Sequence, residues 1–464
     1  MNRLADIQHI YFIGIGGIGM SALARYFYSL GKQVSGYDRV ETTLTRQLAE
    51  EGIGICYQDD VSLAPHDADL VVYTPAIPES HRQLSFYRAN RYTLLKRSEV
   101  LAEITADTFN ICVAGTHGKT TVSTMIAHLL RHTGYGCNAF LGGIAVNYNT
   151  NFWSAERALC VVEADEYDRS FLRLRPDIAV ITAMDADHLD IYGTEETMQE
   201  AFIEFTRKIK PGGCLLVKKG LRRSAELQAG RVLTYHLSDT TADAYAKNIT
   251  VSEGHYRFDI SVDGELLRHI ELQMGGLHNV ENAVAAVAVA RLLRIETDRI
   301  RKAVQEFRGV KRRFEYIISE KGWVYIDDYA HHPEELAALL TSAKHLFNGY
   351  HCTVIFQPHL YSRTRDLAPA FAASLDIADE AILLPVYPAR EQPIEGVSSA
   401  MIADRMGAGK ATLVDKEQLL PFLKKRIRDR QGEPQLFITA GAGDIDKLVG
   451  PISELLNDLP EHAH

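Results

Sequence analysis

The sequence lacks the features that mark several classes of protein. It has no low-complexity tract and no apolar run of the roughly 18 residues needed to cross a membrane. Its first residues do not combine a charged start with the apolar stretch of a signal peptide. These absences predict a cytoplasmic protein with no membrane partner.

Cysteine is scarce and is not arranged for metal or disulfide chemistry. The six cysteines are widely spaced, and none forms a Cys-x-x-Cys pair. Four of them, Cys112, Cys160, Cys214 and Cys352, lie in apolar runs typical of strands. We expect small buried side chains in a reducing compartment, and neither a zinc site nor a disulfide framework.

Basic residues do not accumulate as they do in proteins that bind nucleic acid. The formal net charge is −10, and the acidic residues are dispersed along the chain. The only dense basic run is KKRIRDR at 424–430, which is typical of a solvated helix face. No nucleic-acid partner is expected, because such proteins normally carry a basic face.

What is present indicates an ordinary globular chain of the α/β class. The 464 residues are 46% hydrophobic and 24% charged, and the length fits about three domains. Short β-branched runs that are apolar on both faces alternate with helical stretches, as in parallel sheets covered by helices. The expected strands are HIYFIG, ADLVVYT, NICVAGT, ALCVVEAD, DIAVITAMD, WVYIDDY, CTVIFQPH, EAILLPVY and QLFITAGAG.

Three restarts of a strand-and-glycine pattern predict domains at 1–107, 108–312 and 313–464. Residues 243–275 break the pattern, since alternating residues around Asp263-Gly264 indicate a hairpin and an antiparallel edge on the middle domain. An alanine-rich helix is expected to begin near Asn279. Polar residues end nearly every strand, and open parallel sheets bind ligands beyond the carboxyl ends of their strands.

The first strand ends in a glycine-rich turn. Gly14, Gly16 and Gly19 have the G-x-G-x-x-G spacing of a dinucleotide-binding turn, and Asp38 follows where such folds place a ribose-binding acid. A nicotinamide dehydrogenase is one hypothesis. A second phosphate-binding signature further along the chain argues against it, because hydride transfer needs only one.

That second signature is GTHGKTT at 115–121, between the apolar NICVA and the helix-like VSTMIAHLLRH. Strand, glycine turn, Lys-Thr and helix form the context of a P-loop, although Val113 stands where the first glycine of the full motif would be. Backbone N–H groups would hold phosphates, Lys119 would neutralise them, and Thr120 would be free to ligate Mg²⁺.

Carboxylates and histidines gather at other strand ends. One group, after the strand ALCVVEAD, is Glu163, Asp165, Glu166 and Asp168, and a second, after DIAVITAMD, is Asp185, Asp187, His188 and Asp190. Clustered carboxylates repel one another unless a cation lies between them, so the first group predicts a Mg²⁺ site beside the P-loop. The second group includes a histidine that could be a further metal ligand.

Three more polar groups lie in or near the last domain. Arg312 and Arg313 fall near a domain junction, where a guanidinium fork could bind phosphate. The other two groups follow strands and favour a substrate pocket: they are Asp327, Asp328, His331 and His332, and then His359, Arg363 and Arg365.

Across nearly its whole length the sequence resembles the Mur ligases, the ATP-dependent amide-forming enzymes of peptidoglycan precursor synthesis. The resemblance rests on ordered, mostly polar motifs, two of which depart from the family at Leu360, often an arginine, and Arg390, often a glycine. The motifs are GIGGIGMSALA, TPAIP, GTHGKTT, EADEYDRSFL, DHLDIYG, GLHNVENA, GVKRRFE, DDYAHHP, QPHLYSRT, YPAREQPIEG and AGAGDI.

The resemblance implies three α/β domains: a Rossmann-like domain that receives a UDP-sugar, a central P-loop domain that binds ATP, and a Rossmann-like domain for the amino acid. It implies that L-alanine is joined to the lactyl carboxylate of UDP-N-acetylmuramate through an acyl phosphate, by a monomer or homodimer. The first glycine turn would then hold a pyrophosphate without hydride chemistry.

The resemblance also implies roles for individual residues. The substrate-binding residues would be Gly14, Gly16, Gly17, Gly19, Met20, Asp38, Thr74, His332, His359 and Arg363. ATP would be bound by Gly115, Thr116, His117, Gly118, Lys119, Thr120, Thr121, Asn279, Asn282 and Arg313. Mg²⁺ would be held by Thr120, Glu163 and His188, and the catalytic residues would be Lys119, His188, Arg313, Asp327 and His331.

Two further alternatives remain beside the dehydrogenase. A recycling ligase that adds a whole peptide to UDP-N-acetylmuramate would share the P-loop and the UDP domain, although GIGM and QPHLYSRT favour the single-amino-acid enzyme. A non-catalytic nucleotide sensor would bind ATP and the UDP-sugar and release no phosphate.

Overall fold

The computed structural model describes residues 4, 6–185, 189–252, 254–320, 322–389, 391–430 and 432–458. The chain divides into two compact units. Unit 1 comprises Met1–Asn248, Phe258–Ile270 and Glu281–Phe307, and unit 2 comprises Ile249–Arg257, Glu271–Val280 and Arg308–His464.

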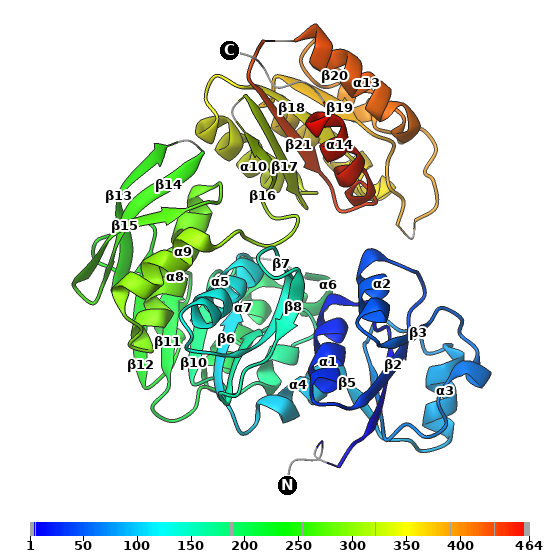
Figure 1. Ribbon diagram of the computed structural model, residues 1–464, viewed down its shortest axis with the longest axis vertical. Helices are drawn as coiled ribbons and strands as arrows, with labels where there is room; N and C mark the ends of the chain where they lie inside the picture. Colours follow the sequence, from blue (N-terminus) through cyan, green and yellow to red (C-terminus); the bar gives the residue numbers. More distant parts are fainter. Residues whose placement is uncertain are drawn as a thin grey trace. The chain divides into compact units, whose positions relative to one another are not determined.

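The first sheet of unit 1 has five parallel strands in the order β3-β2-β1-β4-β5, drawn in blue in Figure 1. Because β2 and β4 flank β1 on opposite sides, the strand order reverses at β1, and the crevice for a ligand is expected at its carboxyl end. The strands are β1 (His9–Ile13), β2 (Gln33–Tyr37), β3 (Gly54–Cys56), β4 (Leu70–Tyr73) and β5 (Leu94–Lys96). The helices are α1 (Ile18–Ser29), α2 (Thr43–Glu50), α3 (Arg82–Ala89) and α4 (Arg97–Thr105), with a 3₁₀ turn at Val61–Leu63.

The second sheet has ten strands in the order β15-β14-β13-β12-β11-β10-β6-β9-β7-β8. Its centre is parallel, and β7 pairs with β8 in antiparallel fashion. The strands are β6 (Phe109–Ala114), β7 (Asn138–Ala145), β8 (Thr150–Trp153), β9 (Leu159–Glu163), β10 (Ile178–Ile181), β11 (Cys214–Lys218), β12 (Arg231–His236), β13 (Ala244–Ser252), β14 (His255–Val262) and β15 (Glu265–Leu272). The helices are α5 (Lys119–His132), α6 (Leu189–Tyr192), α7 (Glu195–Thr206), α8 (Leu277–Leu292) and α9 (Thr297–Glu306), with 3₁₀ turns at Ser170–Arg173 and Ser224–Glu226.

The predicted hairpin is confirmed between β14 and β15. Asp263 and Gly264 form its two-residue turn with φ of 50° and 79°, the left-handed pair that matches the twist of the flanking strands. The alanine-rich helix is α8, which begins two residues before the predicted Asn279.

Helix α1 joins the two sheets of unit 1. Its Tyr26 ring packs on Phe140 of β7, with 5.5 Å between centroids. The buried Arg25 guanidinium donates to the carboxylate of Glu51 and, at 2.5 Å, to Asn151 Oδ1 on β8. Because α1 begins directly after the glycine turn, this packing fixes the turn relative to the central sheet.

Unit 2 contains a six-stranded sheet in the order β16-β17-β21-β18-β19-β20, parallel except for the antiparallel pair β16 and β17. The sequence did not predict β16. The strands are β16 (Glu315–Glu320), β17 (Trp323–Asp328), β18 (His351–Phe356), β19 (Glu380–Leu383), β20 (Ala411–Leu413) and β21 (Gln435–Ala440). The helices are α10 (Pro333–Leu346), α11 (Tyr361–Leu375), α12 (Ala400–Ala403), α13 (Lys416–Asp429) and α14 (Asp446–Asn457).

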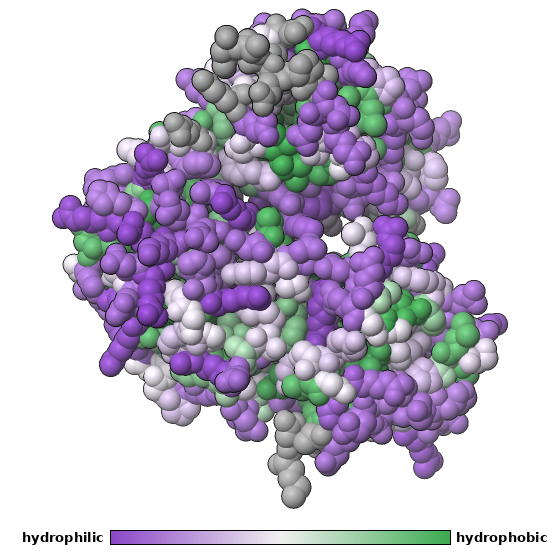
Figure 2. All heavy atoms as spheres, viewed as in Figure 1, coloured by the Kyte–Doolittle hydropathy of each residue, from purple (hydrophilic) through white to green (hydrophobic). Residues whose placement is uncertain are grey.

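The burial of the cysteines in apolar runs and the exposure of the basic run agree with the sequence prediction. All six cysteines are free, and the four placed in apolar runs are buried. The basic run 424–430 lies mostly on the exposed face of α13 and its end. On the face drawn in Figure 2 hydrophilic residues predominate. Among the described helices, none is long and apolar enough to span a membrane.

His128 makes the stability of unit 1 sensitive to acid. Its ring is buried in α5, with Nε2 2.8 Å from the Ala303 carbonyl oxygen and Nδ1 2.9 Å from the Tyr148 hydroxyl. Burial lowers the pKa of His128 to about 4. Since the unfolded chain takes up this proton near pH 6.5 and the folded chain does not, the free energy of unfolding should fall by up to about 3 kcal/mol between pH 7 and 4.

Urea unfolding at several pH values checks this expectation. Trp153, whose ring packs on Tyr148 at 4.9 Å, is a fluorescent probe of the region in a Trp323→Phe background. In His128→Gln the free energy of unfolding should decrease much less between pH 7 and 4. If it decreased with pH as steeply as in wild type, His128 would not be held neutral in the folded chain.

Candidate functional site

The glycine turn after β1 meets Asp38 and Thr74 at the carboxyl edge of the first sheet. The Gly16 amide donates to Asp38 Oδ2 at 2.8 Å, and a side chain at Gly16 would come within 2.6 Å of Thr45. Gly14 has φ of 89° and lies against Thr74, the residue that follows β4. The structure therefore brings these predicted residues together around a helix N-terminus that suits an anion.

The remaining residues of this turn have different surroundings. Gly17 immediately precedes α1, so its backbone forms the entry to the helix. The Met20 side chain is buried in the hydrophobic core of unit 1, beneath the turn. Gly19 in the first turn of α1 lies directly under the Arg97 guanidinium.

The P-loop connects β6 to α5 and is held by the end of β10. Gly115 and Gly118 have φ of 136° and 81°, which glycine adopts readily. The Thr116 amide donates to the Ala183 carbonyl at 3.2 Å, and the Thr182 hydroxyl donates to the His117 carbonyl. His117 is exposed, whereas Thr120 and Thr121 are buried. The loop thus has the rigid, backbone-lined form that binds phosphate.

Two predicted asparagines lie on α8. Asn282 in unit 1 faces the P-loop, because its Oδ1 lies 3.1 Å from the position that a Cβ on Gly118 would take. Asn279 in unit 2 is buried and donates from Nδ2 to the Gly275 carbonyl at 2.6 Å.

Lys119 is paired with a carboxylate inside unit 1. Its Nζ donates to Glu166 Oε1 at 2.6 Å and to the Gly115 carbonyl at 2.7 Å. Glu166 is fully buried, which raises its pKa, and Lys119 opposes that shift. An anion bound in the loop would compete with Glu166 for the ammonium group.

The four carboxylates after β9, for which the sequence predicts a Mg²⁺ site, contact different partners. Among the described residues, no three metal-ligating side chains of His, Cys, Asp or Glu are grouped to hold an ion. Each of the four instead has its own partner: Glu163 faces Thr120, Asp165 faces Arg97, Glu166 faces Lys119, and Asp168 accepts from the Ser170 amide. Different partners separate them because the chain turns sharply after the strand.

The pair of Thr120 and Glu163 remains suited to Mg²⁺. The Thr120 hydroxyl donates to Glu163 Oε1 at 3.0 Å, and the Gly142 amide donates to Oε2 at 3.0 Å. Mg²⁺ prefers oxygen ligands and is commonly held by one or two carboxylates together with substrate phosphates and water. The third predicted ligand, His188, lies outside the described residues, as does Asp187.

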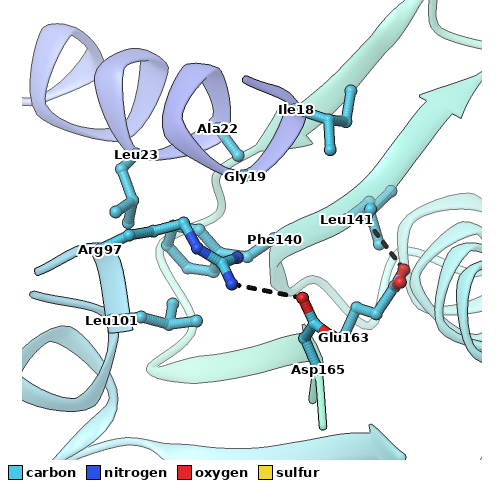
Figure 3. A pocket seen from close by; sticks show the side chains of 11 residues that line it. Ile18, Gly19, Ala22, Leu23, Arg97, Leu101, Phe140, Leu141, Glu163 and Asp165 are labelled. Carbon is cyan, nitrogen blue, oxygen red and sulfur yellow. Dashed lines mark hydrogen bonds and ion pairs between the residues drawn. The ribbon is translucent and has the colours of Figure 1, made fainter. Parts of the chain in front are cut away.

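A cavity of about 100 Å³ adjoins this pair (Figure 3). Arg97 of α4 reaches across it to Asp165, with 3.5 Å between Nη2 and Oδ2. Gly19 and Glu163 also line it. Sequence analysis missed Arg97, although it follows β5 directly and therefore lies at the same carboxyl edge as Gly14 and Thr74. The sequence did not predict β5, because a strand of three residues is too short to show an apolar run.

In unit 2, Arg312 and Asp327 form a buried pair at the end of β17. Arg312 Nε donates to Asp327 Oδ2 at 3.2 Å, and the Thr439 hydroxyl donates to Oδ1 at 2.6 Å. The neighbouring Asp328 accepts from two backbone amides, and burial raises its pKa to about 6. Arg313, to which the family resemblance assigns a role at the nucleotide, is exposed on the surface of unit 2.

Two histidines of unit 2, His331 and His359, lie close together before α11. Their ring centroids are 6.1 Å apart, and His359 stacks on Tyr387 with 5.8 Å between centroids. Burial lowers the pKa of both histidines. Among the described residues, His359 Nδ1 and Arg363 Nη1 are buried without a hydrogen-bond partner. An anionic ligand would satisfy the guanidinium.

The flanking residues shape this group. His332 is the N-cap residue of α10, and its amide donates to Glu335 at 3.1 Å. Leu360 has φ of 70° and precedes α11. Ser362 in the first turn of that helix donates to Glu391 from both amide and hydroxyl.

Three family descriptions match successive parts of the chain. They are "Mur ligase family, catalytic domain" at residues 9–108, "Mur ligase middle domain" at 113–290 and "Mur ligase, glutamate ligase domain" at 312–443. Together they account for most of the sequence.

Individual relatives match over nearly full length. The UDP-N-acetylmuramate–L-alanine ligase of Parabacteroides distasonis is 48% identical, over 97% of this chain and 97% of its own. The crystal structure of UDP-N-acetylmuramate-alanine ligase MurC from Thermotoga maritima is 30% identical, with a TM-score of 0.82 over 97% of this chain and 99% of its own. A murein peptide ligase from Psychrobacter arcticus shares the fold at 22% identity, with a TM-score of 0.65 over 98% and 99%.

Proposed function

The chain belongs to the Mur ligase family, and on that premise we propose that it joins L-alanine to the lactyl carboxylate of UDP-N-acetylmuramate with conversion of ATP to ADP and phosphate. The observation that carries this proposal is the 48% identity, over 97% of the chain, to a relative named for that reaction. The separate glycine turn and P-loop support it, since both precede helix N-termini of unit 1 and both are suited to bind phosphate.

Each of the three domains would bind one substrate: the UDP-sugar at 1–107, ATP at 108–312 and the amino acid at 313–464. The first would receive the UDP-sugar at Gly14, Gly16, Gly17 and Gly19, with Asp38 and Thr74 beside the turn and Met20 supporting it from the core. Free cysteines and nucleotide substrates suit a cytoplasmic enzyme. The family resemblance implies a monomer or a homodimer.

The P-loop would hold ATP. Backbone amides of 115–121 would bind the phosphates, and Lys119 would move from Glu166 to neutralise them. Asn279, Asn282 and Arg313 are assigned to the nucleotide by the family resemblance. Thr120, Glu163 and His188 would hold Mg²⁺, which when bound supplies positive charge against the phosphates.

The chemistry follows from the weakness of a carboxylate as an acyl electrophile. A lactyl carboxylate oxygen attacks the γ-phosphorus of ATP. The bond between that phosphorus and the oxygen bridging it to the β-phosphorus breaks, which gives an acyl phosphate and releases ADP. The L-alanine amine then attacks the acyl carbon, loses a proton and expels phosphate. Lys119 stabilises the charge that develops in the first transfer.

The amino acid is assigned to unit 2. The buried Arg363 Nη1 lacks a hydrogen-bond partner among the described residues, and a guanidinium binds a carboxylate well. Since Leu360 does not supply the arginine frequent in the family, Arg363 would hold the L-alanine carboxylate, with His332 and His359 nearby. Asp327 and His331 are the further catalytic candidates of this unit.

A recycling ligase that adds a peptide is the second candidate, and it shares this fold. It has less support, because the murein peptide ligase is 22% identical and the alanine-adding relative 48%.

Phosphate release decides between these functions. The enzyme is given ATP, Mg²⁺ and UDP-N-acetylmuramate with L-alanine, a tripeptide or no acceptor. We expect release that depends on L-alanine and a product heavier by one alanyl residue. Release with the tripeptide alone would assign the recycling reaction, and no release with any acceptor would contradict both.

A further inference from the structure

The cavity in Figure 3 has apolar, basic and acidic walls. Leu23, Leu101, Phe140 and Leu141 supply apolar surface, and Arg97 supplies positive charge. Of the two carboxylates, Glu163 faces Thr120 and Asp165 faces Arg97, so the guanidinium is the group in the lining that a ligand carboxylate would bind. Such a lining suits a small aliphatic group that carries one anion. The volume of about 100 Å³ leaves room for a few heavy atoms.

The cavity lies between two parts of the site already described. One wall is Gly19, in the first turn of the helix that follows the sugar-nucleotide turn. Another is Glu163, whose Oε1 accepts from Thr120 of the P-loop helix. A group in this cavity would therefore lie next to both the UDP-sugar turn and the proposed Mg²⁺ position.

The Arg97 guanidinium is held where it can exchange partners. A Cβ on Gly19 would lie 2.5 Å from Nη1, so a larger residue there would displace the guanidinium from this position. Its bond to Asp165 is long, at 3.5 Å, and the two side chains are 25% and 38% exposed. An ion pair of this kind contributes little stability, and a carboxylate that accepts two hydrogen bonds from the guanidinium would replace it readily.

We propose that this cavity binds the lactyl group of UDP-N-acetylmuramate, with Arg97 binding the carboxylate and the apolar wall receiving the methyl group. The inference rests on the proposed function and deepens it by assigning Arg97 to the substrate. A lactyl group is favoured over the diphosphate because the apolar wall fits a methyl group. The carboxylate must also reach the phosphoryl group handled at Thr120 and Glu163.

Calorimetry without ATP tests this assignment with two ligands. UDP-N-acetylmuramate carries the lactyl group, and UDP-N-acetylglucosamine is the same sugar nucleotide without it. Arg97→Met should bind the first about tenfold or more weakly and the second within twofold of wild type. Arg97→Lys, which keeps the charge and loses the fork, should lie between.

The matched control is Arg173→Met. Arg173 also forms a 3.5 Å ion pair, with Glu99 on the same helix α4, but does not line the cavity. It should bind both ligands as wild type does, and melting curves should show that all variants are folded.

Equal weakening of both ligands in Arg97→Met would assign Arg97 to the diphosphate or to general stability and overturn the proposal. Unchanged binding of both would overturn it as well. Failure of the proposed function is seen separately, because wild type would then show no L-alanine-dependent phosphate release.

Discussion

Replacing Lys119 with alanine should lower ATP-dependent phosphate release by about a thousandfold or more, since it removes the P-loop cation that offsets charge on the transferring phosphoryl group. Affinity for UDP-N-acetylmuramate should stay within about twofold of wild type, because the glycine turn belongs to a different sheet. Phosphate release and calorimetry measure the two effects on the same preparation.

The buried Glu166 requires a control in this experiment. Without Lys119 its carboxylate loses the 2.6 Å ion pair while fully buried, which alone destabilises unit 1. The double variant Lys119→Ala with Glu166→Gln removes that charge and should melt at a higher temperature than the single variant, yet release no more phosphate. Near-normal turnover in either variant would mean that the ATP site lies elsewhere.

The strands that could be predicted are those buried on both faces. Every expected apolar run contains a strand of the structure, because helices on both faces of a parallel sheet select such runs. Strand β5 has three residues, and β7 contains Gly142 and Gly143, so neither has the β-branched pattern that marks a strand. These omissions matter, because β7 lines the cavity that contains Arg97 and β5 directly precedes that arginine.

A local sequence motif could be predicted, whereas contacts between residues distant in the sequence could not. Lys119 and Thr120 follow from a local pattern of strand, glycine turn and helix, which the structure confirms. Partners distant in sequence could not be predicted: Glu166 lies 47 residues from Lys119, and Asp165 lies 68 from Arg97. Only the folded sheet brings them together.

Two adjacent arginines also show what the sequence cannot predict. Sequence could not tell which of Arg312 and Arg313 points inward, whereas the fold turns the first toward Asp327 through a φ of 60°. The local backbone conformation decides which arginine forms the buried pair.

Gly115→Ala should lower the stability of unit 1 by about 3 kcal/mol or more and reduce phosphate release about a hundredfold. A Cβ at this position would lie 2.2 Å from Thr182 Oγ1 and 2.8 Å from the Ala183 amide nitrogen. Since the Thr182 hydroxyl also holds the His117 carbonyl, relieving the overlap displaces the phosphate-binding backbone. Thermal melting and phosphate release are the measurements.

Two further variants separate overlap from backbone strain. Gly134 also has a positive φ, 73°, but a Cβ there would meet open space, so Gly134→Ala should cost about 1 kcal/mol and leave turnover unchanged. Combining Gly115→Ala with Thr182→Ala removes the closest contact and leaves the one with Ala183, so it should recover part of the stability and little activity. If Gly115→Ala were no worse than Gly134→Ala, the loop would be loose enough to move aside, and the rigid P-loop on which the ATP assignment depends would be wrong.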